Sequence, residues 1–185
     1  MRVIAGQYRG RRFRSVPKGI RPSSDRLRET LFSILGDAVE GSVWLDPFTG
    51  SGAVGIEALS RGARHVIMGD RSSESVNAAR KNLRNCVGVQ NYEIHRLDAF
   101  VLLRRLQSPP LDYVFLDPPY NFKRHEKILR ALKASPSVHA NTRVILETFK
   151  KTEVKFVPET LTVFRLVRVG DSKLLFMRLS QSSKK

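Results

Sequence analysis

The chain has 185 residues, 41% of them hydrophobic and 27% charged, which is enough for one domain with a sizeable core. Lysine and arginine number 33 against 17 acidic residues, so the net charge of +16 predicts a polyanionic partner, either nucleic acid or anionic lipid. The sequence excludes a membrane span, because no run of about 18 apolar residues exists. The single cysteine, Cys86, excludes an internal disulfide and is compatible with the cytoplasm, and the four scattered histidines lack metal-ligand spacing, so no metal is expected.

The first 20 residues are expected to form a basic arm folded as a short hairpin. Gly6 and Gly10 separate short β-type runs in RVIAGQYRGRRFRSVP, and no acidic residue precedes position 25. Tyr8 and Phe13 lie among the arginines, where they either stack on single-stranded bases or pack against the rest of the domain. An arginine-rich, acid-poor start is also typical of a mitochondrial transit peptide, but this stretch lacks the pattern of an amphipathic helix.

Beyond the arm, helix-like and strand-like segments alternate. Ser23 or Ser24 caps a first helix, in which Leu27, Leu31 and Leu35 recur at helical spacing. Strands are expected at residues 43–46, 65–70, 92–98, 111–117 and 143–148, with helices over 53–63, 72–85, 99–106 and 125–135. Two further strands, 162–169 and 172–179, flank a Gly-Asp turn and form a closing hairpin. The pattern predicts an α/β domain over residues 21–180, with an open sheet that is parallel at its start and antiparallel at its edge, and a frayed tail at 181–185.

A glycine turn, LDPFTGSGAVG, follows the first expected strand and contains G-x-G-x-x-G at Gly50, Gly52 and Gly55. This pattern is typical of dinucleotide-binding turns, yet Asp46 stands just before it, where a pyrophosphate would be repelled. S-adenosylmethionine carries a carboxylate for the helix N-terminus and cationic groups for Asp46, so the turn favours this methyl donor. Phe48 is expected to line the donor or to pack under the turn, and Gly55 to ease the packing of the helix on the sheet.

Aspartates also follow the second, third and fourth expected strands. Ligands of open α/β sheets bind at the carboxyl ends of the strands, so aspartates at four such ends predict a site rather than four unrelated turn formers or helix caps. Asp70 is the only acid that ends the second strand, and it is the candidate for the ribose hydroxyls of the donor. Asp98 is expected to accept a hydrogen bond from the adenine amine, with the N–H of Ala99 or Phe100 near the ring nitrogen.

The fourth expected strand ends in DPPY, residues Asp117, Pro118, Pro119 and Tyr120. An exocyclic amine of a base is a poor nucleophile because its lone pair is conjugated into the ring. The Asp117 carboxylate and the Pro118 carbonyl would accept its two N–H groups, favour a tetrahedral nitrogen and stabilise its developing charge. Consecutive prolines stiffen the loop, and Tyr120 offers a flat face to the extruded base. Taken alone, the two prolines would also fit a rigid turn.

The two motif-bearing segments, LDPFTGSGAVGIEALSRGA and LDYVFLDPPY, resemble the Rossmann-like class I methyltransferases. RVIAGQYRGRRF, RPSSDRLRETLFSIL and RVGDSKLLFMRL resemble the RsmD-type enzymes, and the signature RP-x-x-D-x-x-RE (Arg21, Pro22, Asp25, Arg28 and Glu29) narrows the resemblance to them. The resemblance implies a seven-stranded sheet with an antiparallel last strand, a monomer, and methylation of the N2 amine of one guanine in small-subunit (16S) ribosomal RNA. The substrate would be presented on a partly or fully assembled small subunit.

The resemblance also implies roles for particular residues. The donor would be lined by Asp46, Phe48, Gly50, Gly52, Asp98, Ala99 and Asp117, with the target amine and base held by Asp117 to Tyr120. Contacts to RNA are expected from the arginines of the arm and the first helix: Arg2, Arg9, Arg11, Arg12, Arg14, Arg21 and Arg28. One departure concerns the ribose, because RsmD-type enzymes commonly have E-x-D at the end of the second strand, and Met68 stands here in place of the glutamate.

Three other functions stay open at this stage. An N6-adenine methyltransferase acting on DNA or RNA needs the same two acceptors as a guanine-N2 enzyme, so DPPY does not distinguish them. A ribosome-assembly RNA-binding protein with a weakened donor site is a second alternative, supported only by Met68. A dinucleotide oxidoreductase is disfavoured by Asp46 and has no use for DPPY.

Overall fold

The structure is a computed structural model that describes residues 1–17, 24–86, 88–107, 109–119, 121–153 and 157–180. Its elements, in chain order, are α1 (Asp25–Leu35), η1 (Gly36–Val39), β1 (Val43–Asp46), α2 (Ala53–Ser60), β2 (His65–Asp70), α3 (Ser73–Arg84), β3 (Tyr92–Arg96), α4 (Ala99–Arg105), β4 (Tyr113–Leu116), α5 (His125–Lys133), β5 (Arg143–Phe149), β6 (Leu161–Val169) and β7 (Ser172–Leu179). None of the described helices is long and apolar enough to cross a membrane.

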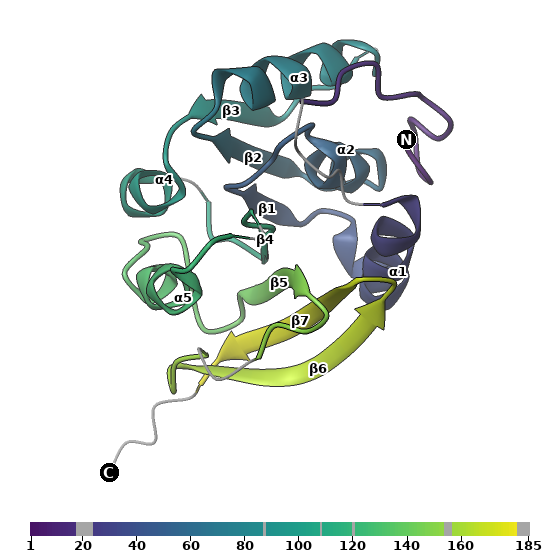
Figure 1. Ribbon diagram of the computed structural model, residues 1–185. Coiled ribbons are helices and arrows are strands. Elements are labelled where there is room, and N and C mark those ends of the chain that lie inside the picture. The colour runs from purple at the N-terminus through teal and green to yellow at the C-terminus, as the bar shows by residue number, and fades with distance from the viewer. Residues whose placement is uncertain (18–23, 87, 108, 120, 154–156, 181–185) are drawn as a thin grey trace.

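The strands form one seven-stranded sheet in the order β3-β2-β1-β4-β5-β7-β6 (Figure 1). The first five strands in that order are parallel, whereas β7 is antiparallel to both β5 and β6. The predicted α/β fold with an antiparallel edge hairpin is therefore confirmed. Chain order changes direction between β1 and β4, and this is where ligands bind in open α/β sheets.

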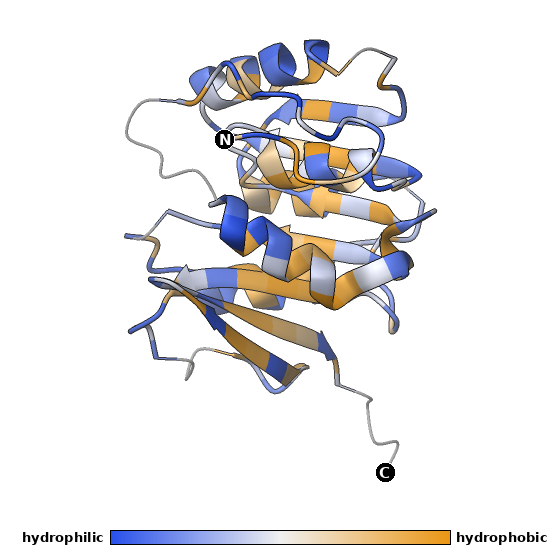
Figure 2. Ribbon diagram, turned by 90° about the vertical axis from the view of Figure 1, so that its right-hand side faces the viewer, coloured by the Kyte–Doolittle hydropathy of each residue, from blue (hydrophilic) through white to orange (hydrophobic). Residues whose placement is uncertain are grey.

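Helices cover both faces of the sheet (Figure 1). On one face, α1, α2 and α3 pack over a cluster that contains Phe32, Trp44 and Phe115. On the other face, α4 and α5 pack over the aliphatic side chains of β1, β4 and β5. In Figure 2 hydrophobic residues colour much of the sheet, while polar residues colour the outer faces of the helices. The β strands in the centre are thus buried on both faces, as expected of parallel strands.

Short-range signals set most element boundaries. The Ser24 hydroxyl accepts a hydrogen bond from the Leu27 N–H at 3.1 Å and caps α1, and Ser72 caps α3 in the same way. The third strand is shorter than predicted. It ends at Arg96, because Asp98 serves as the N-cap of α4 and accepts a hydrogen bond from the Phe100 N–H.

The basic arm is docked on α2 through the buried carboxylate of Glu57. Residues 1–13 fold back on themselves with a single antiparallel bridge between Arg2 and Arg12, so the expected hairpin is minimal. The two Glu57 oxygens accept hydrogen bonds from the N–H groups of Ile4 and Ala5 at 2.8 and 3.0 Å. Gly6 lies so close to α2 that an added Cβ would stand 1.8 Å from the Ser60 carbonyl oxygen.

Arg28 is a buried structural residue, which corrects its prediction as an RNA contact. Its side chain is fully buried and forms ion pairs with Glu57 at 3.1 Å and Asp25 at 2.7 Å. It also donates to the Arg2 carbonyl. Burial lowers the pKa of Arg28, and the two carboxylates oppose this shift. Because the side chain is fully buried and paired with two carboxylates, it cannot contact a phosphate of RNA.

The two aromatic residues of the arm pack against the domain. Tyr8 is buried in the core on the α2 face, and half-buried Phe13 packs against the same cluster. The Arg28 guanidinium lies over the Phe13 ring at 5.3 Å. Of the two interpretations of these aromatics, the geometry favours packing over stacking on bases. Arg21 lies outside the described residues.

Replacing Glu57 by glutamine should destabilise the protein by about 3 kcal/mol, because Arg28 would lose its buried counter-charge and the arm one of its acceptors. The measurement is chemical denaturation of both proteins at pH 7. Glu126→Gln is the matched control, since Glu126 pairs with Arg130 on an exposed face of α5 and should cost under about 1 kcal/mol. Equal stability of the Glu57 and Glu126 variants would contradict the anchoring role of Glu57.

Candidate functional site

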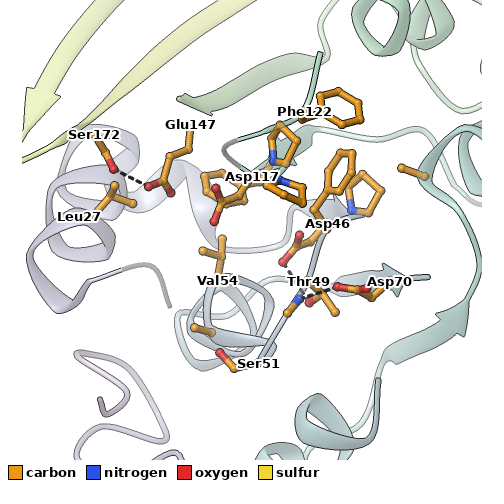
Figure 3. Close-up of a pocket in the computed structure, with 18 of the residues that line it drawn as sticks. Leu27, Asp46, Thr49, Ser51, Val54, Asp70, Asp117, Phe122, Glu147 and Ser172 are labelled. Carbon is orange, nitrogen blue, oxygen red and sulfur yellow. Dashed lines mark hydrogen bonds between the residues drawn. The ribbon is translucent and has the colours of Figure 1, made fainter. Parts of the chain in front are cut away.

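A cavity of about 680 Å³ opens at the carboxyl ends of β1, β2, β4 and β5 (Figure 3). Most of the predicted site residues line it: Asp46, Phe48, Gly50, Asp70, Asp98, Ala99, Asp117, Pro118 and Pro119. Gly52 is not among its lining residues, and Tyr120 lies outside the described residues. The structure also brings in residues that the sequence interpretation missed: Phe122, Arg124, Glu147 and Ser172.

The glycine turn has the backbone shape that its glycines permit. Gly50 and Gly52 have φ of 52° and 82°, the left-handed region in which glycine is favoured. A Cβ on Gly52 would lie 3.1 Å from Ala79 Cβ, so this glycine lets the turn approach α3. Gly55 eases helix packing as predicted, because an added Cβ would meet the Met68 sulfur at 2.8 Å.

Asp46 is a buried carboxylate at the end of β1. One oxygen accepts a hydrogen bond from the Thr49 hydroxyl at 3.1 Å, whereas the other has no hydrogen-bond partner among the described residues. Burial raises the pKa of Asp46 from 3.8 to about 7, opposed by the hydrogen bonds from Thr49 and the Phe48 N–H and assisted by nearby Asp70. A buried carboxylate oxygen that lacks a donor fits a ligand that brings a cation or an N–H group to the cavity.

Asp70 is held by backbone N–H groups on both of its oxygens. Gly50 donates to Oδ2 at 3.1 Å and Ser72 donates to Oδ1 at 2.8 Å, which ties the glycine turn to the start of α3. Met68 is fully buried in the core under α2 and does not line the cavity. Among the described residues of β2, Asp70 is therefore the carboxylate that lines the cavity.

Aromatic rings form a cluster beside the cavity, between β1, α4 and the loop after β4. The Phe48 and Phe122 rings meet edge to face with centroids 5.6 Å apart. The Arg124 guanidinium lies over the Phe100 and Phe122 rings, at 4.8 and 5.6 Å. The Phe122 N–H donates to the Pro119 carbonyl at 2.8 Å, which closes the loop that begins with Asp117. Phe48, which was expected to line the donor or to pack under the turn, is thus part of an aromatic cluster.

Glu147 lies inside β5, two residues before the strand ends at Phe149, and is beside Asp117 (Figure 3). It is 6% exposed, and its Oε1 accepts a hydrogen bond from the Ser172 hydroxyl at 2.8 Å. The rule that selected the four aspartates, an acid at the carboxyl end of a strand, missed this glutamate because it lies inside β5. Ser172 had no comparable signal, because its position depends on the antiparallel return of β7.

Comparisons with known proteins agree over nearly the whole chain. The family described as "Conserved hypothetical protein 95" matches residues 1–178. The chain is 34% identical over 173 residues to the ribosomal RNA small subunit methyltransferase D of Haemophilus influenzae, covering 92% of this chain and 89% of that protein. The chain belongs to the RsmD family of methyltransferases.

Further relatives extend this result. The RsmD protein of Escherichia coli is 31% identical over 167 residues, covering 89% of this chain and 83% of its own. A solved structure from Thermus thermophilus, described as a hypothetical protein, superposes with a TM-score of 0.82 at 27% identity. It covers 97% of this chain and 99% of its own, so the fold is shared from end to end.

The buried Asp46 carboxylate predicts a pH-dependent stability. Because its pKa is raised on folding, the folded protein binds the proton more tightly than the unfolded chain, so the free energy of unfolding falls as pH rises from about 4 to about 7. Asp46→Asn has no carboxyl group to ionise, so its free energy of unfolding should not fall over this range. The variant should be more stable than the wild type at pH 8, by on the order of 2–4 kcal/mol, but not more stable at pH 4.

Urea denaturation at the two pH values measures the difference. Asp37→Asn, at an exposed aspartate in η1, is the control and should leave the pH dependence unchanged. If the free energy of unfolding changes with pH equally in the wild type and in Asp46→Asn, the pKa of Asp46 is not raised by folding, which would contradict the prediction.

Proposed function

We propose that this chain is an S-adenosylmethionine-dependent methyltransferase that acts on the N2 amine of a guanine in small-subunit ribosomal RNA. The observation that carries the proposal is one cavity that joins the glycine turn and Asp46 to the Asp117-Pro118 acceptors. The names of the RsmD relatives support ribosomal RNA as the substrate, and the resemblance to RsmD-type enzymes supports the N2 position.

The residues around the glycine turn fit the methyl donor. The unpartnered Asp46 oxygen would accept from the donor's ammonium group, and Asp70 would face its ribose hydroxyls. Asp98 would accept from the adenine amine. The Phe100 N–H is already donated to Asp98, so we assign the N–H near the adenine ring to Ala99.

When bound, S-adenosylmethionine supplies a methyl group from its sulfonium: the new bond to N2 forms as the bond to sulfur breaks, and its electron pair stays on sulfur. Asp117 and the Pro118 carbonyl accept the two N–H groups of the amine and orient its lone pair toward the methyl group. Asp117 then takes the proton that the methylated nitrogen loses and passes it to water. Tyr120 is proposed to stack on the extruded base.

The arm supplies the proposed contact to RNA phosphates. Its side chains Arg2, Arg9, Arg11, Arg12 and Arg14 are all exposed. Glu57 and Ser60 fix the backbone of the arm on α2, the helix that follows the glycine turn. Basic side chains held this way would guide RNA toward the cavity without ordering a loose tail at each encounter. We further propose that the protein acts in the cytoplasm as a monomer on an assembling or assembled small subunit.

The purified protein should transfer a labelled methyl group from S-adenosylmethionine to small ribosomal subunits from cells that lack the modification. Asp117→Ala should lower the rate by at least about 100-fold, because the amine loses an acceptor that stabilises its developing charge. Scintillation counting of the RNA gives the rate, and calorimetry gives donor affinity, which should change little.

The control is Asp37→Ala, an exposed aspartate that does not line the cavity. Labelling of duplex DNA but not of small subunits would refute the RNA substrate. A fully active Asp117→Ala protein would refute the proposed role of Asp117.

Reversing two charges on the arm, Arg11→Glu with Arg12→Glu, should weaken binding of small-subunit RNA about tenfold or more near 0.1 M salt. The slope of log affinity against log salt should decrease in magnitude by about 1.5 to 2, because fewer counterions are released from the RNA when two phosphate contacts are lost. Filter binding over a salt series measures both.

Arg104→Glu with Arg105→Glu is the matched control, since these exposed residues end α4 on the opposite face of the sheet. An unchanged salt slope for the arm variant, or the same change in both variants, would show that the arm does not contact phosphate.

A further inference from the structure

Glu147, inside β5, and Asp117, directly after β4, lie side by side. In the register of β4 with β5, Leu116 lies opposite Leu146, so the residues that follow this pair along the chain are Asp117 and Glu147. Adjacent strands are about 4.8 Å apart, which places the two carboxylates within reach of a single base. Both residues line the cavity.

The two side chains also point to the same face of the sheet. Side chains alternate along a strand, and Phe115 and Ile145, two residues earlier, both belong to the core cluster under α1 and α2. Figure 3 accordingly shows Asp117 and Glu147 directed into the cavity, with Leu27 of α1 and Val54 of α2 opposite. Glu147 is nearly buried and is oriented by the Ser172 hydroxyl, so its position is fixed before any ligand arrives.

Two carboxylates at this end of the cavity suit a base edge that is rich in donors. The Watson–Crick edge of guanine presents the N1–H beside the two N–H groups of N2, which makes three adjacent donors. The chain offers three acceptors in the same region, namely the Asp117 carboxylate, the Pro118 carbonyl and the Glu147 carboxylate. Adenine presents two N–H groups on N6, but its neighbouring N1 is an acceptor that would face a carboxylate and be rejected.

We propose that Glu147, oriented by Ser172, accepts the N1–H of the target base and is the residue that selects guanine over adenine. This assignment rests on the proposed function, because it takes the amine held by Asp117 to be N2 of guanine. It supplies the discrimination that DPPY lacks, since the two DPPY acceptors serve either amine equally. Glu147 is a specificity residue in this scheme, and Ser172 is a positioning residue.

The test uses small subunits reconstituted with RNA that carries either guanine or 2-aminopurine at the position to which the label maps. 2-Aminopurine keeps the N2 amine but has an acceptor at N1. The wild type should prefer guanine, in kcat/KM, by roughly 10- to 100-fold. Glu147→Gln places an N–H donor on a side chain of the same size. The variant should have a kcat/KM on guanine that is lower by a similar factor, and it should prefer 2-aminopurine.

Two further variants isolate the effect. Ser172→Ala should lower kcat/KM on guanine several-fold while keeping the preference for guanine, because the carboxylate stays but is less well oriented. Glu126→Gln on α5 is the control and should behave as the wild type. The affinity for S-adenosylmethionine should stay within about twofold in every variant, which shows that the donor half of the cavity is intact.

The outcomes separate this inference from the proposed function. If the wild type methylates guanine and Glu147→Gln keeps the same rate and the same preference, Glu147 does not read the base. An unchanged rate for Ser172→Ala would remove Ser172 from the scheme. If the wild type methylates neither base in these particles, the proposed function is itself wrong, and the assignment of Glu147 is refuted with it.

Discussion

The parallel direction of β3, β2, β1, β4 and β5 is the constraint on which the site depends. Parallel strands end at one edge of the sheet, so residues that are distant in sequence, such as Asp46, Asp117 and Glu147, meet around one cavity. The change of direction between β1 and β4 opens the sheet there, because the connecting helices cover opposite faces. The loops after these strands can therefore change chemistry while the buried strands keep the frame.

The protein separates its charges by burial. Its net charge is strongly positive, yet carboxylates gather inside, at the cavity and in the pair that Glu57 forms with Arg28. A buried carboxylate is costly unless donors surround it, and burial accordingly raises the pKa of Asp46. The protein itself supplies the hydrogen-bond donors around Glu57, so this carboxylate stabilises the fold. At Asp46 part of that demand is unmet among the described residues, which is the property of a binding site.

Local signals predicted most of the fold from the sequence. Hydrophobic runs placed β1 and β2 to the residue, and serine caps placed the starts of α1 and α3, because these features depend on neighbours in the chain. Strand ends likewise predicted the aspartates of the cavity. The incorrect predictions concern contacts between residues far apart in the sequence. Arg28 was predicted to be an exposed basic residue, but the fold buries it against Glu57, 29 residues along the chain. Glu147 lies inside β5, so the rule for strand ends missed it, and its hydrogen bond with Ser172 depends on an antiparallel partner that no local pattern reveals.

In the proposed scheme the three donors of a guanine edge meet three acceptors, two directly after β4 and one inside β5. The most direct test is the chemical identity of the product: small subunits are methylated by the purified protein, their RNA is digested to nucleosides, and the labelled nucleoside is identified by mass spectrometry against standards. The expected labelled product is N2-methylguanosine. N6-methyladenosine or N1-methylguanosine would contradict it, because neither product arises from an amine held by Asp117 with the N1–H of guanine on Glu147.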